Sequence, residues 1–174
     1  MTLPLQDSRK KDTVLALRPV PRDRIDLVAG VQVAAEQRVF TGTVAQAFRS
    51  REGGIDFHGV FRGERAVGFF KIDRRYARRY TFAALNDLGL RAFMIDLSHQ
   101  GQGLGTAATA MLGPYIRAAY PEAATLWLTV NKSNPAAIRA YGKGGFTDTG
   151  KMWLLGNAGP QHIMRLPLPP ANAA

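Results

Sequence analysis

Cysteine is absent from the 174-residue sequence, which excludes disulfides, thiolate metal ligands and a cysteine nucleophile. No apolar run approaches the roughly 20 residues of a membrane-spanning helix, and no apolar segment follows the N-terminal charges as in a secretory signal. The three histidines show no metal-site spacing with acidic residues. We therefore expect a metal-free cytoplasmic protein with a single domain over residues 1–174, including a flexible arm at 1–12 and a loose tail at 167–174.

Acidic residues are also scarce, since 13 Asp and Glu against 23 Lys and Arg leave a formal net charge of +10. Such a charge favours polyanions: nucleic acid, an anionic membrane surface or a phosphate-rich cofactor. Part of the excess lies in Arg74–Arg79, which holds four arginines and Tyr76. This segment is interpreted either as a solvated basic face or as a docking patch for phosphate or RNA. No nucleic-acid-binding motif supports RNA beyond the charge.

Short apolar stretches of two different periods alternate along the chain. Strands are predicted at Val14–Val20, Asp56–Arg62, Ala66–Asp73, Leu90–Leu97, Thr125–Val130, Phe146–Leu155 and Gln161–Leu166, and helices within Arg24–Phe48 and at Leu104–Tyr120 and Asn134–Lys143. Thr43 is the expected N-cap after a break in the first helical segment. An antiparallel meander, a strand–helix–strand crossover between parallel strands and a final hairpin predict an α/β fold with a mixed sheet.

Three closely spaced glycines lie in Gln100–Thr106, between a predicted strand and a predicted helix. Glycine lets the backbone turn tightly and lets a ligand approach without an intervening Cβ. The free N–H groups and the positive dipole end of the following helix favour phosphate oxygens without a metal. By itself, the loop indicates either a phosphate site or a glycine-rich turn with no ligand.

Two other phosphate loops fit this segment poorly. A nucleoside-triphosphate loop ends in Gly-Lys-Ser/Thr, whereas Gly105 is followed by Thr106. A dinucleotide loop requires a third glycine where Thr106 stands, and an acidic residue at the end of the next strand, where Asn131 stands.

A second motif, Asn134–Tyr141 followed by Gly145 and Phe146, comes after the strand at Thr125–Val130. Asn134 and Tyr141 lie two helical turns apart, so they share one helix face. Alone, the motif has a structural interpretation in which Asn134 caps the helix and Tyr141 packs on the sheet.

Together the two motifs resemble the GCN5-related N-acetyltransferase (GNAT) superfamily. The matching positions are Gln100, Gly103 and Gly105 in the loop, and Asn134, Ala137, Tyr141, Gly145 and Phe146 in the second motif. Phe93–Asp96 and Glu36–Phe40 are similar to the diamine and spermine/spermidine acetyltransferase branch, although His99 and Gln102 depart from its pattern.

The resemblance implies a GNAT-like mixed, mostly antiparallel central sheet flanked by helices, with a splayed pair of central parallel strands. It implies acetyl-CoA as the cosubstrate, with its pantetheine arm on the backbone of Met94, Ile95 and Leu97 and its pyrophosphate on the glycine loop. The implied cofactor-binding residues are Met94, Ile95, Leu97, Gln100, Gly101, Gln102, Gly103, Leu104, Gly105, Thr106 and Asn134.

For the chemistry, the resemblance implies direct attack of a neutral amine on the thioester, with Tyr141 as the general acid for the departing thiolate. The base is left open among Asp96, His99, Glu36 and a water chain. Glu36 and Asp96 are also the candidate acceptor-binding residues. His58 and His162 are expected to be ordinary hairpin residues.

The expected acceptor is a small primary amine, and the branch resemblance favours a di- or polyamine. The net charge of +10 opposes a polycation. The alternatives are therefore a protein N-terminus or lysine, an RNA-linked aminoacyl group, and a non-catalytic acyl-CoA-binding module. A homodimer is a further expectation, because dimers are common in the family.

Overall fold

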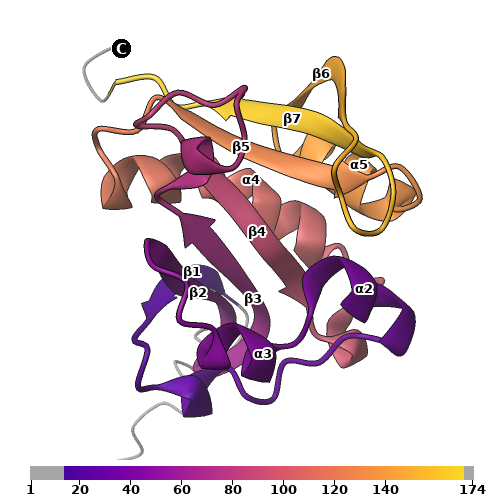
Figure 1. Ribbon diagram of the computed structural model, residues 1–174. Coiled ribbons are helices and arrows are strands. Elements are labelled where there is room, and N and C mark those ends of the chain that lie inside the picture. Colours follow the sequence, from indigo (N-terminus) through magenta and orange to yellow (C-terminus); the bar gives the residue numbers. More distant parts are fainter. Residues whose placement is uncertain (1–13, 171–174) are drawn as a thin grey trace, which may run out of the picture.

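The computed structural model describes residues 14–170, so the expected arm at 1–12 and the last four residues of the expected tail lie outside the described part. The strands are β1 (Leu15–Val20), β2 (Ile55–Arg62), β3 (Arg65–Asp73), β4 (Leu88–Ile95), β5 (Thr125–Asn131), β6 (Thr147–Trp153) and β7 (Gln161–Pro167) (Figure 1). The helices are α2 (Arg38–Thr41), α3 (Val44–Arg49), α4 (Leu104–Ala119) and α5 (Pro135–Lys143), with 3₁₀ turns η1 (Ile25–Leu27), η2 (Ala35–Gln37), η3 (Tyr76–Arg78) and η4 (Leu97–His99).

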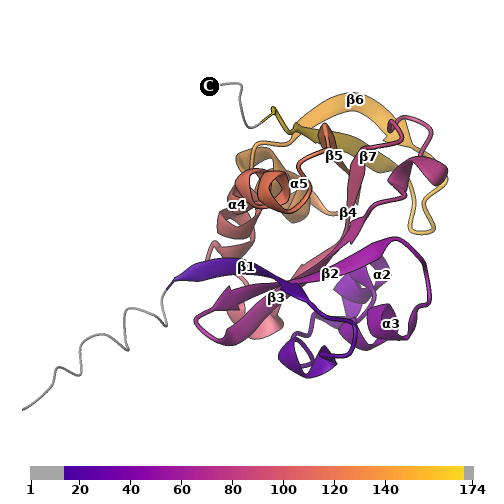
Figure 2. The same ribbon diagram turned by 90° about the vertical axis from the view of Figure 1, so that its left-hand side faces the viewer.

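The described strands form one seven-stranded sheet in the order β1-β2-β3-β4-β5-β7-β6. Neighbours pair antiparallel except β4 and β5, which are parallel and joined through α4. Figure 2 shows α4 and α5 on one face of the sheet and α2 and α3 on the other. The expected mixed, mostly antiparallel α/β fold is confirmed.

The two central parallel strands separate soon after they meet. β4 and β5 pair only at Leu88–Leu126 and Gly89–Trp127. On the other side of β4, Phe69 pairs with Met94 but Lys71 pairs with Arg91, so β4 holds one extra residue in this interval. Ala92 lies within it with a φ of +52°. A bulge bends a strand locally, and here it accompanies the expected splay between β4 and β5.

Each face of the sheet buries its own apolar core. On the α4 face, buried side chains of the helix, such as Leu112 and Ile116, pack with sheet residues that include Phe70 and Leu126. On the opposite face, Val44 of α3 packs with a group that includes Phe57, Phe61, Phe69 and Met94. The alternating strand pattern thus serves two helical layers, and β4 contributes to both.

The hairpins, the long helix and the capped helix lie where they are expected, although several boundaries differ. Arg24–Phe48 is less helical than expected, although Thr43 does cap α3 by accepting a hydrogen bond from the Gln46 amide. The strand expected to end at Leu97 ends at Ile95, because the chain turns into η4. The tail expected from residue 167 starts later, since Leu168 is buried and donates its amide hydrogen bond to the Ala124 carbonyl.

Candidate functional site

The glycine loop joins β4 to the N-terminus of α4. Gly101 and Gly103 have φ values of +73° and +76°, a region that residues with a Cβ rarely adopt. No heavy atom lies within 4 Å of the position that a Cβ would take at either glycine. Gly103 is the N-cap of α4 and supplies no side-chain acceptor, so the first amides of this helix have no side-chain cap. The loop therefore offers an open backbone surface for an anion.

A pocket of about 300 Å³ lies over this loop, and we call it the loop pocket. All the cofactor residues expected from the sequence line it except Leu97 and Gln102. The Leu97 amide donates to the Gln32 carbonyl at 2.7 Å, so it is already engaged within the protein. Since β4 and β5 no longer pair at Met94 and Ile95, the β4 edge faces the gap without a neighbouring strand.

Gln100 connects the loop to the helices on the opposite face. Its Nε2 donates to the Ile95 carbonyl at 2.9 Å and to Gln37 Oε1 at 3.0 Å. Gln37 Nε2 in turn donates to Gln100 Oε1 at 3.2 Å. Gln37 and Phe40, which lie in the branch-like Glu36–Phe40 stretch, both line the loop pocket.

Tyr141 projects from α5 toward the gap between β4 and β5. Asn134 caps this helix by accepting a hydrogen bond from the Ala137 amide. The Tyr141 ring packs edge-on against Phe93, with the ring centroids 6.0 Å apart, and against Phe146 at 5.6 Å. Burial raises the pKa of the Tyr141 hydroxyl, so the phenol stays protonated across the physiological range.

A second pocket of about 250 Å³ lies on the other side of Tyr141, and we call it the hairpin pocket. It extends from α2 and β4 to Trp153 and the loop between β6 and β7. Six residues line both pockets: Phe40, Thr41, Phe93, Asn134, Ala137 and Tyr141. The two pockets therefore meet at Tyr141, with the glycine loop on one side and the terminal hairpin on the other.

Residues 30–146, more than half of the chain, match the model of the Acetyltransferase (GNAT) family. The chain belongs to this family. As a GNAT protein it is an acetyl-CoA-dependent N-acetyltransferase. No curated protein matches the chain by sequence.

Solved GNAT-fold structures agree with the described architecture. The aminoglycoside acetyltransferase AAC(6')-Ib in complex with coenzyme A aligns with a TM-score of 0.71 and 17% identity, over 88% of this chain and 95% of that chain. Spermidine N-acetyltransferase from Vibrio cholerae, in complex with CoA and spermine, aligns with a TM-score of 0.63 and 15% identity, over 88% and 95% of the two chains. At these identities the similarity shows the fold.

The loop pocket of this GNAT protein fits acetyl-CoA by its own geometry. The open Cβ positions at Gly101 and Gly103 leave room for phosphate oxygens against the backbone. The unpaired β4 edge offers amide and carbonyl groups to an extended pantetheine arm, as an edge strand offers them to a peptide. No cluster of His, Asp and Glu that could hold a metal occurs among residues 14–170. No helix in this range is long and apolar enough to cross a membrane.

The candidate acidic residues line neither of the two pockets. Glu36 is exposed in η2 and lines neither of them. The Asp96 carboxylate accepts hydrogen bonds from the Gln32 amide at 2.9 Å and from the Ser98 amide at 3.2 Å, and it caps η4. Burial alone would raise the pKa of Asp96, but the hydrogen bonds from Ser98, Gln32 and His99 lower it below its usual value. These contacts support a structural role for Asp96.

Two histidines have interactions that sequence patterns did not indicate. His58 is buried, with Nδ1 2.7 Å from the Tyr115 hydroxyl and Nε2 3.1 Å from the Tyr120 hydroxyl. The Tyr120 hydroxyl donates to Asp56 at 2.8 Å. His162 pairs across the terminal hairpin with Asp148 at 2.8 Å. Because these partners are distant in the sequence, no local pattern signals them.

The arginine segment does not form a single basic face. Arg74 is paired with Asp56 at 2.9 Å, beside the His58 cluster. The Arg75 side chain lies against Gly53 and Gly54. Arg79 lines the hairpin pocket, with its guanidinium 5.7 Å from the centre of the Tyr80 ring. The segment thus contributes one arginine to the site.

Proposed function

We propose that this chain transfers the acetyl group of acetyl-CoA to a primary amine of a small molecule, with Tyr141 as the general acid. The observation that carries this proposal is that the two pockets meet at the buried Tyr141 side chain. In this arrangement the loop pocket takes the cofactor and the hairpin pocket takes the acceptor. The reacting carbonyl would lie at their junction.

On the cofactor side, the pyrophosphate would be bound by backbone amides between Gly101 and Thr106 and by the dipole of α4. The β4 edge at Met94 and Ile95 would bind the pantetheine arm, and Asn134 would contact it from α5. Leu97 is left out of this set because its amide is bonded to Gln32. Gln102 is exposed and lies outside the loop pocket.

The reaction depends more on the orientation of the two reactants than on a strong acid or base. Holding both reactants in adjoining pockets converts a bimolecular encounter into an oriented attack of the amine nitrogen on the thioester carbon. A backbone N–H on the unpaired β4 edge would stabilise the negative charge that develops on the carbonyl oxygen. The Tyr141 hydroxyl, kept protonated by burial, would donate its proton to the departing sulfur.

The attacking amine must be neutral, and the site offers few bases to accept its proton. Glu36 and Asp96 line neither pocket, whereas His99 lines the loop pocket. His99 or a water chain is therefore our proposed route for this proton.

The small size of the hairpin pocket favours a small-molecule acceptor over a protein surface or a tRNA. The structural neighbours are named as aminoglycoside and spermidine acetyltransferases, both of which act on amines of small molecules. Protein and RNA-linked amines remain the alternatives to be tested in the same panel.

The test is an assay of CoA thiol release with acetyl-CoA and a panel of amines, with the N-acetylated product confirmed by mass spectrometry. The panel covers polyamines, aminoglycosides, amino acids, peptides and aminoacyl-tRNA. We expect turnover with at least one small amine. Calorimetric binding of acetyl-CoA without product from any amine would instead identify a non-catalytic acyl-CoA-binding module.

A further inference from the structure

The charged side chains that line the hairpin pocket are unfavourable for a polycationic acceptor. Of the described residues that line it, none is Asp or Glu, and the charged ones are Arg79 and Arg91. The loop pocket likewise has no Asp or Glu among its described lining residues. A spermidine or an aminoglycoside would therefore place several positive charges beside guanidinium groups, with no lining carboxylate to compensate them.

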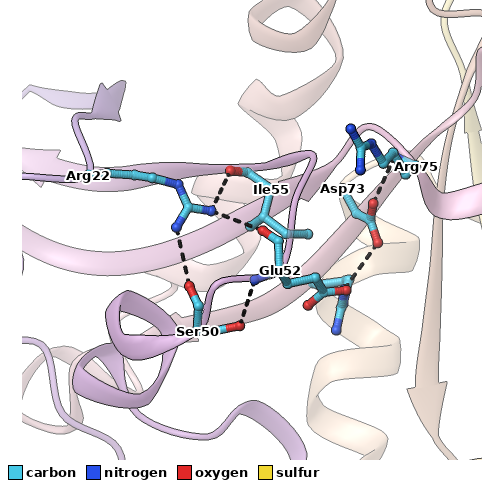
Figure 3. Close-up of polar contacts among 7 residues, drawn as sticks. Arg22, Ser50, Glu52, Ile55, Asp73 and Arg75 are labelled. Atoms are coloured by element: carbon cyan, nitrogen blue, oxygen red, sulfur yellow. Dashed lines mark hydrogen bonds and ion pairs between the residues drawn. The ribbon is translucent and has the colours of Figure 1, made fainter.

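The two carboxylates that pair with the lining residue Arg91 are already bound to other groups. Arg91 Nη1 lies 2.7 Å from Glu52 Oε1 and 3.1 Å from Asp73 Oδ2. Asp73 also accepts a hydrogen bond from the Arg75 amide at 2.8 Å, and Figure 3 shows its carboxylate directed at that amide. Neither acid is therefore available to an incoming ammonium group without loss of these contacts.

The acids behind the pocket are outnumbered by the bases around them. Glu52 and Asp73 are two acids, and the bases around them are Arg91, its cross-strand neighbour Lys71, Arg22 and Arg79. Burial and the neighbouring Arg91 lower the pKa of Lys71, as expected for a half-buried amine in such a group. Arg79 makes no ion pair with any residue between 14 and 170.

The lining around Arg79 combines aromatic rings with amide side chains, among them Asn131, Asn157 and Gln161. Tyr80 and Trp153 pack with their ring centroids 4.9 Å apart, and Phe40 and Phe93 line the side toward Tyr141. A guanidinium without an ion-pair partner, set among polar side chains, favours a ligand with an oxyanion, because arginine binds carboxylate and phosphate oxygens with paired N–H donors.

We propose that the acceptor is an amine that also carries an oxyanion group, a carboxylate or a phosphate, which binds Arg79. This proposal rests on the acetyl transfer proposed above and identifies its acceptor class. It also replaces the polyamine that the branch resemblance favours. The amine itself enters neutral, so the oxyanion is the charge that the pocket recognises.

The test compares acceptors that differ only in this charge. Each L-amino acid is paired with its amide, and O-phosphoethanolamine is paired with ethanolamine, while spermidine and an aminoglycoside serve as polycations. We expect kcat/KM to be about 10-fold or more higher for the anionic member of the preferred pair, as for a hydrogen bond to a charged group. Preference for the amino-acid pairs or for the phosphate pair identifies which oxyanion is used. Equal use of both members, or preference for the polycations, overturns the proposal.

Two charge-reversal variants locate the effect. Arg79→Glu removes the cation that lines the pocket, and Arg78→Glu makes the same change in charge at an exposed neighbour that does not line it. We expect Arg79→Glu to lower kcat/KM for the anionic acceptor about 10-fold or more and to leave that for its neutral partner within about twofold. Arg78→Glu should leave both unchanged. Equal losses in the two variants would show a general field effect and overturn the assignment to Arg79.

Failure of this inference is distinguishable from failure of the proposed function. If no amine is acetylated, calorimetry with an N-acetylated amino acid and its N-acetylated amide still reports the charge preference of the pocket. Tighter binding of the acid, lost in Arg79→Glu, supports the inference. Equal binding of the two compounds contradicts it. If amines are acetylated without any preference for the acids, the proposed acetyltransferase function stands and only the inference about the oxyanion fails.

Discussion

Tyrosine hydroxyls occur in two different settings near the two ends of α4. At the C-terminal end of the helix, Tyr115 and Tyr120 close a polar cluster around His58, and every hydroxyl and ring nitrogen in it has a partner. At the N-terminal end, Tyr141 of α5 faces the gap between β4 and β5, and burial is the only influence on its pKa.

The contrast separates structural polar groups from the proposed general acid. Because Tyr120 donates to Asp56, its oxygen accepts from His58 Nε2, so Nδ1 is left to accept from Tyr115. This closed chain satisfies a neutral histidine and leaves no donor for a ligand. The Tyr141 hydroxyl, in contrast, lies at the junction of two pockets, where a donor would be useful to a substrate.

The largest expected effect is that of Tyr141→Phe on turnover. Removal of a general acid lowers rates by about 100-fold or more. Because the Tyr141 hydroxyl has no partner among the described residues, we expect the free energy of unfolding to change by less than about 0.5 kcal/mol. Steady-state kinetics with the preferred amine and urea unfolding measure the two quantities. Full activity in this variant would remove Tyr141 as the acid and make the two tyrosine settings equivalent.

The second prediction concerns the pH dependence of stability at the closed cluster. Burial lowers the pKa of His58 to about 4, against an unfolded value near 6.5. Below pH 6.5 the unfolded histidine takes up a proton that the folded one does not, so stability falls as the pH drops toward 4. The full loss is about 3 kcal/mol. Urea unfolding between pH 7.5 and 4 measures it.

His58→Gln is the control for that measurement, since it removes the titrating group and leaves the other acids and bases in place. The stability of the parent should fall more steeply with acid than that of the variant. Parallel curves would mean that His58 takes up its proton at the same pH in the folded and unfolded states, and the cluster would then not be closed as described.

Tyr120→Phe is expected to act on stability alone. It removes the hydroxyl that lies 2.8 Å from Asp56 and 3.1 Å from His58, which leaves His58 Nε2 without a partner and Asp56 with Arg74 alone. The expected cost is about 1–3 kcal/mol in unfolding free energy, with kcat within about twofold of the parent. A large loss of kcat at unchanged stability would mean that this cluster takes part in the reaction.

How well the sequence predicted each region depends on whether its signals are local. Gly103 adopts a positive φ, which glycine takes readily, and Asn134 caps α5, which begins at the next residue. Both roles can be recognised from neighbouring residues. The His58 cluster joins residues that are 57 to 64 positions apart in the chain, and Gln37 and Gln100 are 63 apart. The sequence around these residues contains no pattern that predicts such pairs.

Ala92 illustrates the same limit within a strand. Alanine has no preference for a positive φ, yet Ala92 adopts one at the bulge where β4 leaves β5. The sequence could indicate a splayed pair only through the family resemblance. The charge of the hairpin pocket also depends on tertiary structure, because it brings Arg79 to the pocket and leaves Arg74 and Arg75 elsewhere.

The smallest expected effect comes from alanine substitutions at two glycines of α4, one in the loop pocket and one outside it. Gly105 lines the loop pocket, and a Cβ there would lie 3.7 Å from Ile95 Cγ1. Gly113 lies two turns further on, and its Cβ would lie 3.8 Å from Leu166 Cδ2. Both contacts are ordinary, so an alanine at either helical position should stabilise the fold by about 1 kcal/mol.

The two variants should differ in cofactor affinity, because only the methyl group at Gly105 occupies space beside the proposed pyrophosphate site. We expect Gly105→Ala to weaken acetyl-CoA binding about 10-fold, as when a hydrogen bond to a charged group is lost. Gly113→Ala should bind acetyl-CoA like the parent. Calorimetry on both variants, together with their unfolding curves, gives the two quantities independently. If Gly105→Ala bound acetyl-CoA as tightly as Gly113→Ala, the pyrophosphate would have to lie away from the first turn of α4.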